Sequence, residues 1–255
     1  MNEVNMPVAG GWEKKALCSL LVLSCDAYKD LWLPFFNQFN THWADCPYPQ
    51  YLGVGGMNFS HGGVTALHSN AGRDWSQCFL DYLQQIDTEY VLVMLDDFFL
   101  RRKVESRLVT HCLDFAINKQ AVQVRLIPRP GPTHGIPGEE LIGACAPSLR
   151  YRVCAQAAIW NKASLEALLR PGESAWDFET NATERASLDE SAHYSVWRSV
   201  LPYQGMWAHH VIEKGKWLPH EKWIFSRKNI GCDFAARGTL DLGQTVFCQC
   251  ARIFQ

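Results

Sequence analysis

Apolar residues in this chain fall into short runs separated by polar segments, a pattern typical of alternating strands and helices. The run from Tyr90 to Leu95, YVLVML, predicts a strand that is buried on both faces. Similar runs predict further strands over residues 16–25, 47–54, 121–128 and 151–160, with a short last strand near 207–212.

Apolar residues at helical spacing mark most of the segments between these strands. Leu31, Phe35 and Phe39 recur at this spacing, while Pro34 restricts where their helix begins. Strands that alternate with helices favour an α/β fold with a mostly parallel central sheet and helices on both faces. The predicted helices lie within residues 26–39, 75–86, 104–118, 161–169 and 184–198.

Two segments rich in Gly, Pro, Ser and Asn interrupt this alternation. Residues 55–76 predict an irregular loop or a short strand, and residues 128–140 predict a Pro/Gly loop at the rim of a pocket. The sequence shows no internal repeat and no domain linker. We therefore predict a single domain, in which residues 1–15 form an N-terminal extension and residues 222–255 a tail that packs on the domain.

Charge and composition exclude several classes of partner. The 255 residues include 24 Lys and Arg against 26 Asp and Glu, a formal net charge of -2. This balance predicts no broad basic surface for nucleic acid or anionic lipid. The ten cysteines are scattered without the spacing of a zinc site, and we interpret them as reduced thiols.

The first apolar run resembles a signal peptide only in part. Lys14 and Lys15 precede it, but Glu3 and Glu13 lie in the region that would be basic, and no clear cleavage site follows. A buried first strand explains the run better, and no run approaches the ~18 apolar residues of a membrane span. We therefore expect a cytoplasmic protein with at most peripheral association with the inner membrane.

Two adjacent carboxylates, Asp96 and Asp97, directly follow the YVLVML strand. Burying an unpaired carboxylate is costly, so we expect both groups where the strand surfaces and meets a cation. Ligands of open α/β sheets bind at the carboxyl ends of strands. The pair therefore predicts a ligand site; the alternative is a helix cap or an ion pair with Arg101 or Arg102.

Several segments together resemble bacterial glycosyltransferases of surface-polysaccharide assembly, which have the nucleotide-sugar-binding GT-A fold. They are SCDAYKDLWLPFF after the first strand, CPYPQYL, the LDDFF segment with its flanks, YRVCAQAAIWNK, WDFE and KGKW. The resemblance covers residues 16–220 and is strongest at LDDFF. It implies transfer of a hexose from a nucleotide-diphosphate donor, a UDP- or dTDP-sugar, to a hydroxyl of a growing lipopolysaccharide O-antigen or capsule glycan.

The acidic pair suits this chemistry, because a departing diphosphate must be neutralised. Mn or Mg needs only one or two protein carboxylates, since phosphate and water fill its other positions. By similarity, Asp97 is expected to bind the metal, and Asp96 to bind the ribose or to support the metal site indirectly. Many proteins of this fold separate two such aspartates by one residue, so the adjacent pair can reach one ligand only if the strand breaks near Leu95.

The resemblance implies further donor-binding residues. Asp26 follows the first strand, where this fold holds the nucleotide base; the alternative is a turn residue that starts the next helix. Arg73 is expected to reach the diphosphate or ribose, or else to pair with Asp74 or Asp81 at the surface.

Late in the chain, His210 or its neighbour His209 is a candidate metal ligand, with ordinary burial as the alternative. Lys214 and Lys216 flank Gly215, and a glycine there allows backbone and ammonium groups to approach phosphate closely. We therefore expect this loop to close over the donor.

WDFE supplies the candidate catalytic base, because direct displacement needs a carboxylate to take the proton of the acceptor hydroxyl. Asp177 and Glu179 would share one face of an extended segment. Asp177 is preferred, since Glu179 equally suits the first turn of a following helix; a plain capping segment is the alternative. Trp176 beside the base is a candidate acceptor-binding residue. Arg129 in the Pro/Gly loop is another, with a rim residue of no chemical role as the alternative.

The leading hypothesis is a metal-assisted, inverting glycosyltransferase that acts on a saccharide or lipid-linked saccharide, with no nucleic-acid partner. One alternative is a sugar-phosphate nucleotidyltransferase on a similar fold, although SCDAYKDLW is not the Gly-rich basic loop of such enzymes. The other is a non-catalytic carbohydrate-binding protein, whose glycan binding would need neither metal nor nucleotide.

Overall fold

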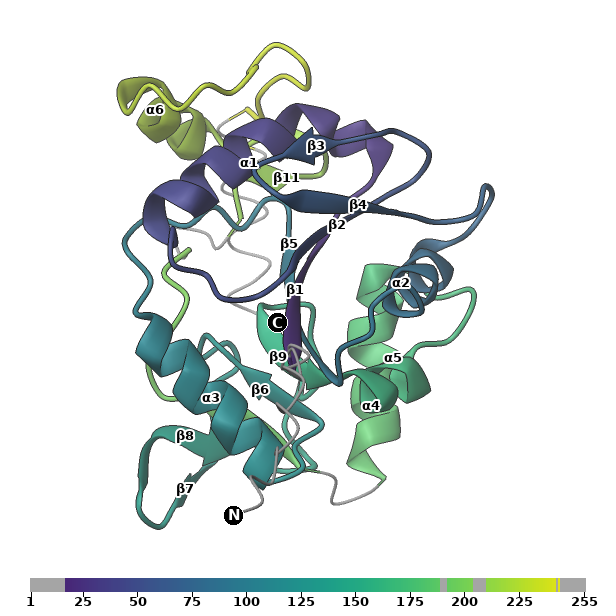
Figure 1. Cartoon of the computed structure of the whole chain (residues 1–255), viewed down its shortest axis with the longest axis vertical. Coiled ribbons are helices and arrows are strands. Elements are labelled where there is room, and N and C mark those ends of the chain that lie inside the picture. The colour runs from purple at the N-terminus through teal and green to yellow at the C-terminus, as the bar shows by residue number, and fades with distance from the viewer. Residues whose placement is uncertain (1–16, 189–191, 204–209, 242, 244–255) are drawn as a thin grey trace, which may run out of the picture.

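A computed structural model describes residues 17–188, 192–203, 210–241 and 243 of the chain. They contain one mixed sheet in the strand order β3-β4-β2-β1-β5-β9-β6-β10-β8-β7, covered by helices on both faces (Figure 1). The predicted α/β architecture is confirmed, but the prediction of a mostly parallel sheet is wrong, because antiparallel pairs join β5, β9 and β6, β10 and β8, and the two edge hairpins. The strands are β1 (Cys18–Leu23), β2 (Gln50–Val54), β3 (Ser60–His61), β4 (Val64–His68), β5 (Tyr90–Leu95), β6 (Gln123–Arg125), β7 (His134–Ile136), β8 (Glu139–Ala144), β9 (Ala158–Asn161) and β10 (His193–Val196).

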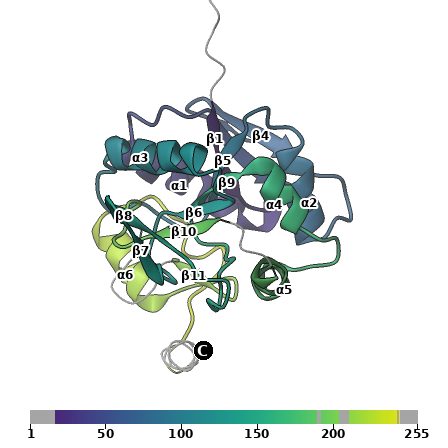
Figure 2. The same ribbon diagram turned by 90° about the horizontal axis from the view of Figure 1, so that it is seen from below.

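Helices α1 and α3 lie on one side of the sheet, and α2, α4 and α5 lie on the other (Figures 1 and 2). A small separate hairpin, β11 (Ile212–Glu213) with β12 (Lys216–Trp217), leads into the last described helix. The helices are η1 (Asp26–Tyr28, a 3₁₀ turn), α1 (Lys29–His42), α2 (Trp75–Leu83), α3 (Ser106–Asn118), α4 (Lys162–Leu168), α5 (Ala175–Ser187) and α6 (Pro219–Arg227).

The two central strands explain why the sheet is covered on both faces. Side chains of a strand alternate between its faces. Leu92 and Met94 of β5 therefore join the core beneath α1 and α3, while Val91 and Val93 join the core beneath α2, α4 and α5. All four are at most 4% exposed, which confirms the prediction that YVLVML is buried on both faces.

The direction of the strands changes across the sheet. β1 is parallel to β2 and β5, and β2 is parallel to β4. β9 runs antiparallel to both β5 and β6, and the β7–β8 hairpin adds another antiparallel pair. The sheet is thus parallel around β1 and mixed beyond β5, because the helix-strand alternation stops after α3.

Three predicted elements differ from the structure. Residues 151–157 form turns, so that only β9 at the end of this segment is a strand. The Pro/Gly segment 128–140 contains β7 and the start of β8. The helix expected over 184–198 is instead α5, which begins at Ala175, followed by β10. The last strand expected near 207–212 lies partly outside the described residues.

Side-chain caps explain where three helices begin. Asp74 before α2 and Ser174 before α5 each form a capping box, with Gln77 and Asp177 as the third helical residues. Asn161 caps α4 by accepting a hydrogen bond from the Ser164 amide at 3.0 Å. The Ser174-to-Asp177 spacing is the signal that places the start of α5 earlier than expected.

Helix α6 is fixed to the loop after β5 by a buried ion pair. Arg101 Nη2 lies 2.7 Å from Glu221 Oε2, and the Glu221 side chain is fully buried. The Arg101 Nε also donates to the Tyr203 carbonyl at 3.2 Å.

Within the described ranges, no helix has the length and apolarity to cross a bilayer.

Replacing Glu221 by Gln is expected to lower the free energy of unfolding by about 3 kcal/mol or more, because the Arg101 guanidinium stays buried without its partner. Glu105→Gln is the matched control, since its pair with Arg107 is exposed and such pairs contribute about 0–1 kcal/mol. Urea unfolding of both variants measures the difference. Similar small losses in both would contradict the structural role of the Arg101–Glu221 pair.

Candidate functional site

The order in which successive strands are added to the sheet reverses at β1. β2 and then β4 are added on one side of β1, whereas β5 is added on the other. In open α/β sheets, ligands bind outside the carboxyl ends of strands at such a switch point. The carboxyl ends of β1 and β5 therefore define the candidate site, and residues 24–28 and 96–97 extend from them.

Asp96 occupies the buried side of this site. Its carboxylate accepts a hydrogen bond from the Ser24 hydroxyl, which in turn accepts one from Trp32 Nε1 at 2.6 Å. Burial and the neighbouring charge of Asp97 raise the pKa of Asp96 well above its ordinary value. A hydroxyl from the end of β1 thus holds Asp96, and neither Arg101 nor Arg102 forms an ion pair with it among the described contacts.

Asp97 turns toward the segment before β11. Its backbone carbonyl accepts a hydrogen bond from the Val211 amide at 3.2 Å. Its Oδ1 is buried and has no hydrogen-bond partner among the described residues. Burial raises the pKa of Asp97 to about 6, against the lowering effect of nearby His210. A buried carboxyl oxygen without a partner requires an explanation, and a bound cation is one.

The Asp96 and Asp97 carboxylates point in different directions because β5 ends just before them, at Leu95. β5 ends at Leu95, and the Phe98 amide donates to the Leu95 carbonyl at 3.1 Å, which forms a turn. This turn allows Asp96 to face β1 while Asp97 faces the segment before β11. The condition that the strand break near Leu95 is confirmed.

The charge of His210 lowers the pKa of the Asp97 carboxyl. The His210 Nε2 is 3.0 Å from Glu213 Oε2. In the part of the chain that the structure describes, no group of three or more His, Cys, Asp and Glu side chains is arranged to hold a metal ion. His209 lies outside the described residues.

Arg237, which the sequence analysis missed, reaches this site from the C-terminal segment. Its Nε donates to Asp30 Oδ2 at 2.8 Å, and its Nη2 donates to Asp30 Oδ1 and to the Ala27 carbonyl. The guanidinium lies 4.3 Å from the centre of the Tyr28 ring. Its positive charge lowers the pKa of both carboxyls of the acidic pair. No motif marks this residue in the sequence.

The lysine loop forms the turn of the β11–β12 hairpin. Lys214 and Gly215 both have positive φ, 49° and 75°, as a tight two-residue hairpin turn requires. Lys214 and Lys216 are exposed, and Arg237 Nη1 donates to the Gly215 carbonyl at 3.3 Å. The loop is therefore attached to the same guanidinium that lies beside the acidic pair.

Asp26 closes the site at the ends of β1 and β2. Its two carboxylate oxygens accept hydrogen bonds from the amides of Gly55 and Gly56, both at 2.9 Å. A Cβ at position 55 would lie 2.9 Å from Asp26 Oδ2, so a larger residue there would displace this carboxylate. Asp26 also begins η1, so the structure places it as a turn residue at the predicted position.

Arg73 lies outside this cluster. Its Nε is 3.5 Å from Asp81 Oδ2, and its side chain is 38% exposed. The surface pair that the sequence left open is therefore the arrangement in the structure.

A second missed residue, Tyr203, connects the acidic pair to the loop before β9. Its ring stacks on Phe98, with centroids 4.6 Å apart and planes 7° from parallel. Its hydroxyl donates to Gln156 Oε1 and accepts from the Ala157 amide, both at 3.1 Å. The nearby charge of Asp97 contributes to the raised pKa of Tyr203 after burial and Cys154. The loop over residues 154–157 thus lies beside the turn that contains Asp97.

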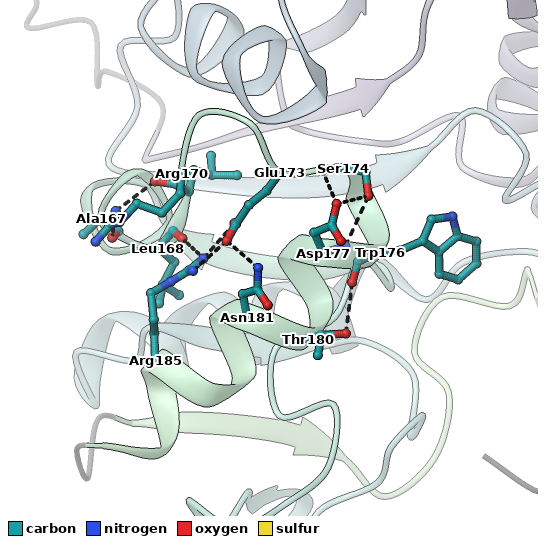
Figure 3. Close-up of polar contacts among 11 residues, drawn as sticks. Ala167, Leu168, Arg170, Glu173, Ser174, Trp176, Asp177, Thr180, Asn181 and Arg185 are labelled. Atoms are coloured by element: carbon teal, nitrogen blue, oxygen red, sulfur yellow. Dashed lines mark hydrogen bonds and ion pairs between the residues drawn. The ribbon is translucent and has the colours of Figure 1, made fainter.

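WDFE lies in the first turns of α5, so the expectation of an extended segment is wrong. Asp177 is exposed and accepts hydrogen bonds from the Ser174 hydroxyl at 2.6 Å and the Ser174 amide at 3.0 Å, which lower its pKa (Figure 3). Glu179 is mostly buried and accepts a hydrogen bond from the Ala155 amide at 2.7 Å. Burial raises the pKa of Glu179, while that amide and Arg125 lower it. The two carboxylates therefore differ in surroundings and do not share a face.

A buried carboxylate fixes the start of α5. Glu173 accepts hydrogen bonds from both Arg185 terminal nitrogens, at 2.7 and 2.8 Å, and from Asn181 Nδ2 at 3.0 Å (Figure 3). These contacts connect the loop before α5 to its third turn. They hold the helix that positions Glu179.

The two candidate acceptor-binding residues are both exposed. Trp176 is 73% exposed and extends from α5 on the side away from Glu173 and Arg185 (Figure 3). The Arg129 carbonyl is the acceptor for the Cys154 thiol, at a distance of 3.7 Å. This contact brings the Pro/Gly loop beside the loop before β9.

No protein-family model matches this sequence, and no curated protein matches it. Among solved structures, the chain is similar to S. aureus TarS 1-349 in complex with UDP, with a TM-score of 0.47 and 13% identity over 71% of this chain and 60% of that chain. It is also similar to the galactosyltransferase LgtC in complex with donor and acceptor sugar analogs, with a TM-score of 0.39 and 10% identity over 88% of this chain and 84% of that chain. A third similar structure is the bifunctional IspDF from Campylobacter jejuni, with a TM-score of 0.39 and 12% identity over 69% and 48%.

The chain thus spans about 60% of the length of the TarS 1-349 structure. The geometry of the acidic pair and its surroundings is the basis for a functional interpretation.

Proposed function

We propose that this protein is a glycosyltransferase that transfers a hexose from a nucleotide-diphosphate donor, a UDP- or dTDP-sugar, to a hydroxyl of a growing lipopolysaccharide O-antigen or capsule glycan. The main support is the acidic pair at the switch point of the sheet: Asp97 has a buried carboxyl oxygen without a described partner, and Asp96 lies buried beside it. Such a pair suits a ligand that brings a cation and a diphosphate together.

The residues present fit a divalent cation that arrives with its donor. Mg and Mn require few protein ligands when phosphate and water supply the rest, which agrees with a cluster of Asp97 and His210 rather than a closed protein cage. We assign Asp97 to the metal, with His210 as a second ligand. The cation would supply charge neutralisation of the leaving diphosphate.

The protein's own cations suit the other side of the diphosphate. Lys214 and Lys216 extend from the turn that Arg237 holds beside the acidic pair. We assign these lysines, with Asp96, to the donor. Asp26 serves the donor indirectly, because its carboxylate orients the Gly55 and Gly56 amides at the end of β2.

We assign the role of catalytic base to Glu179 rather than Asp177. A general base works best when its pKa lies near the working pH. Burial raises the pKa of Glu179, whereas the capping hydrogen bonds lower that of Asp177. Glu179 takes the proton of the acceptor hydroxyl, and direct attack on the anomeric carbon then inverts its configuration. Asp177 fixes the beginning of α5.

The acceptor would approach over the exposed side of α5 and the Pro/Gly loop. An exposed indole provides an apolar face for a sugar ring, so Trp176 suits a saccharide platform. Arg129 lies at the edge of the same region. A lipid-linked saccharide at the cytoplasmic face of the inner membrane is the acceptor that we propose.

Incubation with a panel of nucleotide sugars and Mn or Mg tests this function, because slow transfer to water requires no knowledge of the acceptor. We expect metal-dependent release of a nucleoside diphosphate from one UDP- or dTDP-sugar. Release of pyrophosphate from a nucleoside triphosphate and a sugar phosphate would indicate the nucleotidyltransferase instead. Glycan binding without any response to nucleotide or metal would indicate the carbohydrate-binding protein.

A further inference from the structure

The outer face of α6 exposes a large aromatic side chain. Trp223 is 61% exposed, and the Arg227 guanidinium, one helical turn later, lies 5.2 Å from the centre of its ring. Ser226 on the same side and Lys228 just after the helix are exposed as well. Trp223 therefore stands at the surface among positive groups.

The fold does not use Trp223 to hold α6 in place. The inner side of the helix is fixed by Phe225, whose ring lies 5.0 Å from that of Phe99 and 5.7 Å from that of Trp217. Glu221, also on the inner side, is buried against Arg101. Trp223 is therefore available at the surface for contact with a partner.

The charge of this part of the chain differs from that of the whole. The formal net charge of the protein is -2, yet the segment over residues 214–237 is positive. Of its two acidic residues, Glu221 is fully buried, and Asp233 accepts hydrogen bonds from the amides of Ala235 and Ala236. The basic residues of the segment are Lys214, Lys216, Lys222, Arg227, Lys228 and Arg237, of which Arg237 has its side chain buried in the ion pair with Asp30.

We propose that Trp223, Arg227 and Lys228, here called the α6 face, dock on a bilayer surface of anionic phospholipid. Tryptophan favours the headgroup region of a bilayer, and each Lys or Arg near an anionic leaflet strengthens binding by a factor of about 5. Because the inner side of α6 is packed against the core, only Trp223 and the two basic side chains would contact the lipid headgroups. The α6 face is a local patch of one aromatic and two basic residues, which is compatible with the prediction that the protein has no broad basic surface.

Docking through α6 would place the candidate site close to the bilayer. The Arg101–Glu221 pair connects α6 to the loop after β5. Val211, which directly precedes the β11–β12 hairpin, donates a hydrogen bond from its amide to the Asp97 carbonyl. The inference that this position serves a lipid-linked acceptor rests on the proposed function. The inference that the protein binds lipid rests only on the α6 face.

Co-sedimentation of the full chain with vesicles tests the proposal. We expect binding to phosphatidylcholine vesicles that contain phosphatidylglycerol, weak binding to phosphatidylcholine alone, and loss of binding at raised salt. The double variant Arg227→Glu, Lys228→Glu should lower the partition coefficient at least ~25-fold, and Trp223→Ala several-fold. The matched control is Lys119→Glu, Arg198→Glu, which makes the same change of net charge at exposed positions outside this segment.

Equal losses in the α6 double variant and the control would overturn the proposal, as would equal binding to both vesicle types or no binding. Preferential binding to polyuridylate over vesicles would identify a nucleic-acid surface and overturn it too. Metal-dependent hydrolysis of the donor, measured without vesicles, should be unchanged in the α6 variants. A failure of that hydrolysis in the wild type would count against the proposed function and leave the vesicle result to decide the surface.

Discussion

Asp97→Asn is expected to make the free protein more stable while it abolishes binding of a nucleoside diphosphate with Mn. Burial raises the pKa of Asp97 from 3.8 to about 6, so the folded state disfavours its charged form. Between these values the folded protein binds more protons than the unfolded chain, and stability falls as pH rises through this window. At pH 7 the penalty is up to about 3 kcal/mol, which the neutral amide removes.

Two scans of thermal unfolding separate these effects. Without ligand, the Asp97→Asn variant should unfold at a higher temperature than the wild type at pH 7, and the difference should disappear near pH 4. With UDP or dTDP and Mn, only the wild type should gain stability, by about 2.7 kcal/mol at 100 times the dissociation constant. Asp114→Asn, an exposed position on α3, is the control. A variant that is less stable and still responds to the nucleotide would contradict the assigned role of Asp97.

Glu179→Gln is expected to lower kcat by about 10²–10⁴ while donor binding stays unchanged, because general base catalysis contributes on this scale. Glutamine keeps the size of the side chain and an oxygen that can accept from the Ala155 amide. Asp177→Asn should retain most of the activity, since the Asp177 carboxylate serves the capping box of α5.

The pH dependence provides a second test of Glu179. Burial raises its pKa, so the acidic limb of the kcat profile should lie above the ordinary titration range of a glutamate. The Glu179→Gln variant should lose this limb. Activity that instead depends on Asp177, with Glu179→Gln as active as the wild type, would assign the base to the other carboxylate.

The strongest local patterns predicted the central part of the fold. YVLVML has no polar position, which identifies a strand buried on both faces, and the charged residues after it identify the strand's end. The spacing of Ser174 and Asp177 is that of a capping box and indicates where α5 begins. The start was missed because WDFE was interpreted as an extended segment. The strand over residues 121–128 was also predicted and contains β6, but β7 has only three residues within a Pro/Gly segment, and β10 lies where a helix was expected.

The site was predicted where its residues are adjacent in sequence and missed where the fold brings distant segments together. Asp96 and Asp97 are marked by their position after a strand. Arg237 reaches the same place from the C-terminal segment, and only the three-dimensional arrangement shows its bond to Asp30. The contact of Ser24 with Asp96 could have been predicted, because the two residues directly follow the paired strands β1 and β5.

Calorimetric titration of the wild type with UDP and UMP, each with and without Mn, most directly tests whether the acidic pair serves a metal-bound diphosphate; dTDP and dTMP form a second set. We predict tight binding of a nucleoside diphosphate only with Mn, much weaker binding of the monophosphate, and no metal-dependent gain in the Asp97→Asn variant. Equal binding of diphosphate and monophosphate without metal, or no binding of any nucleotide, would contradict the account.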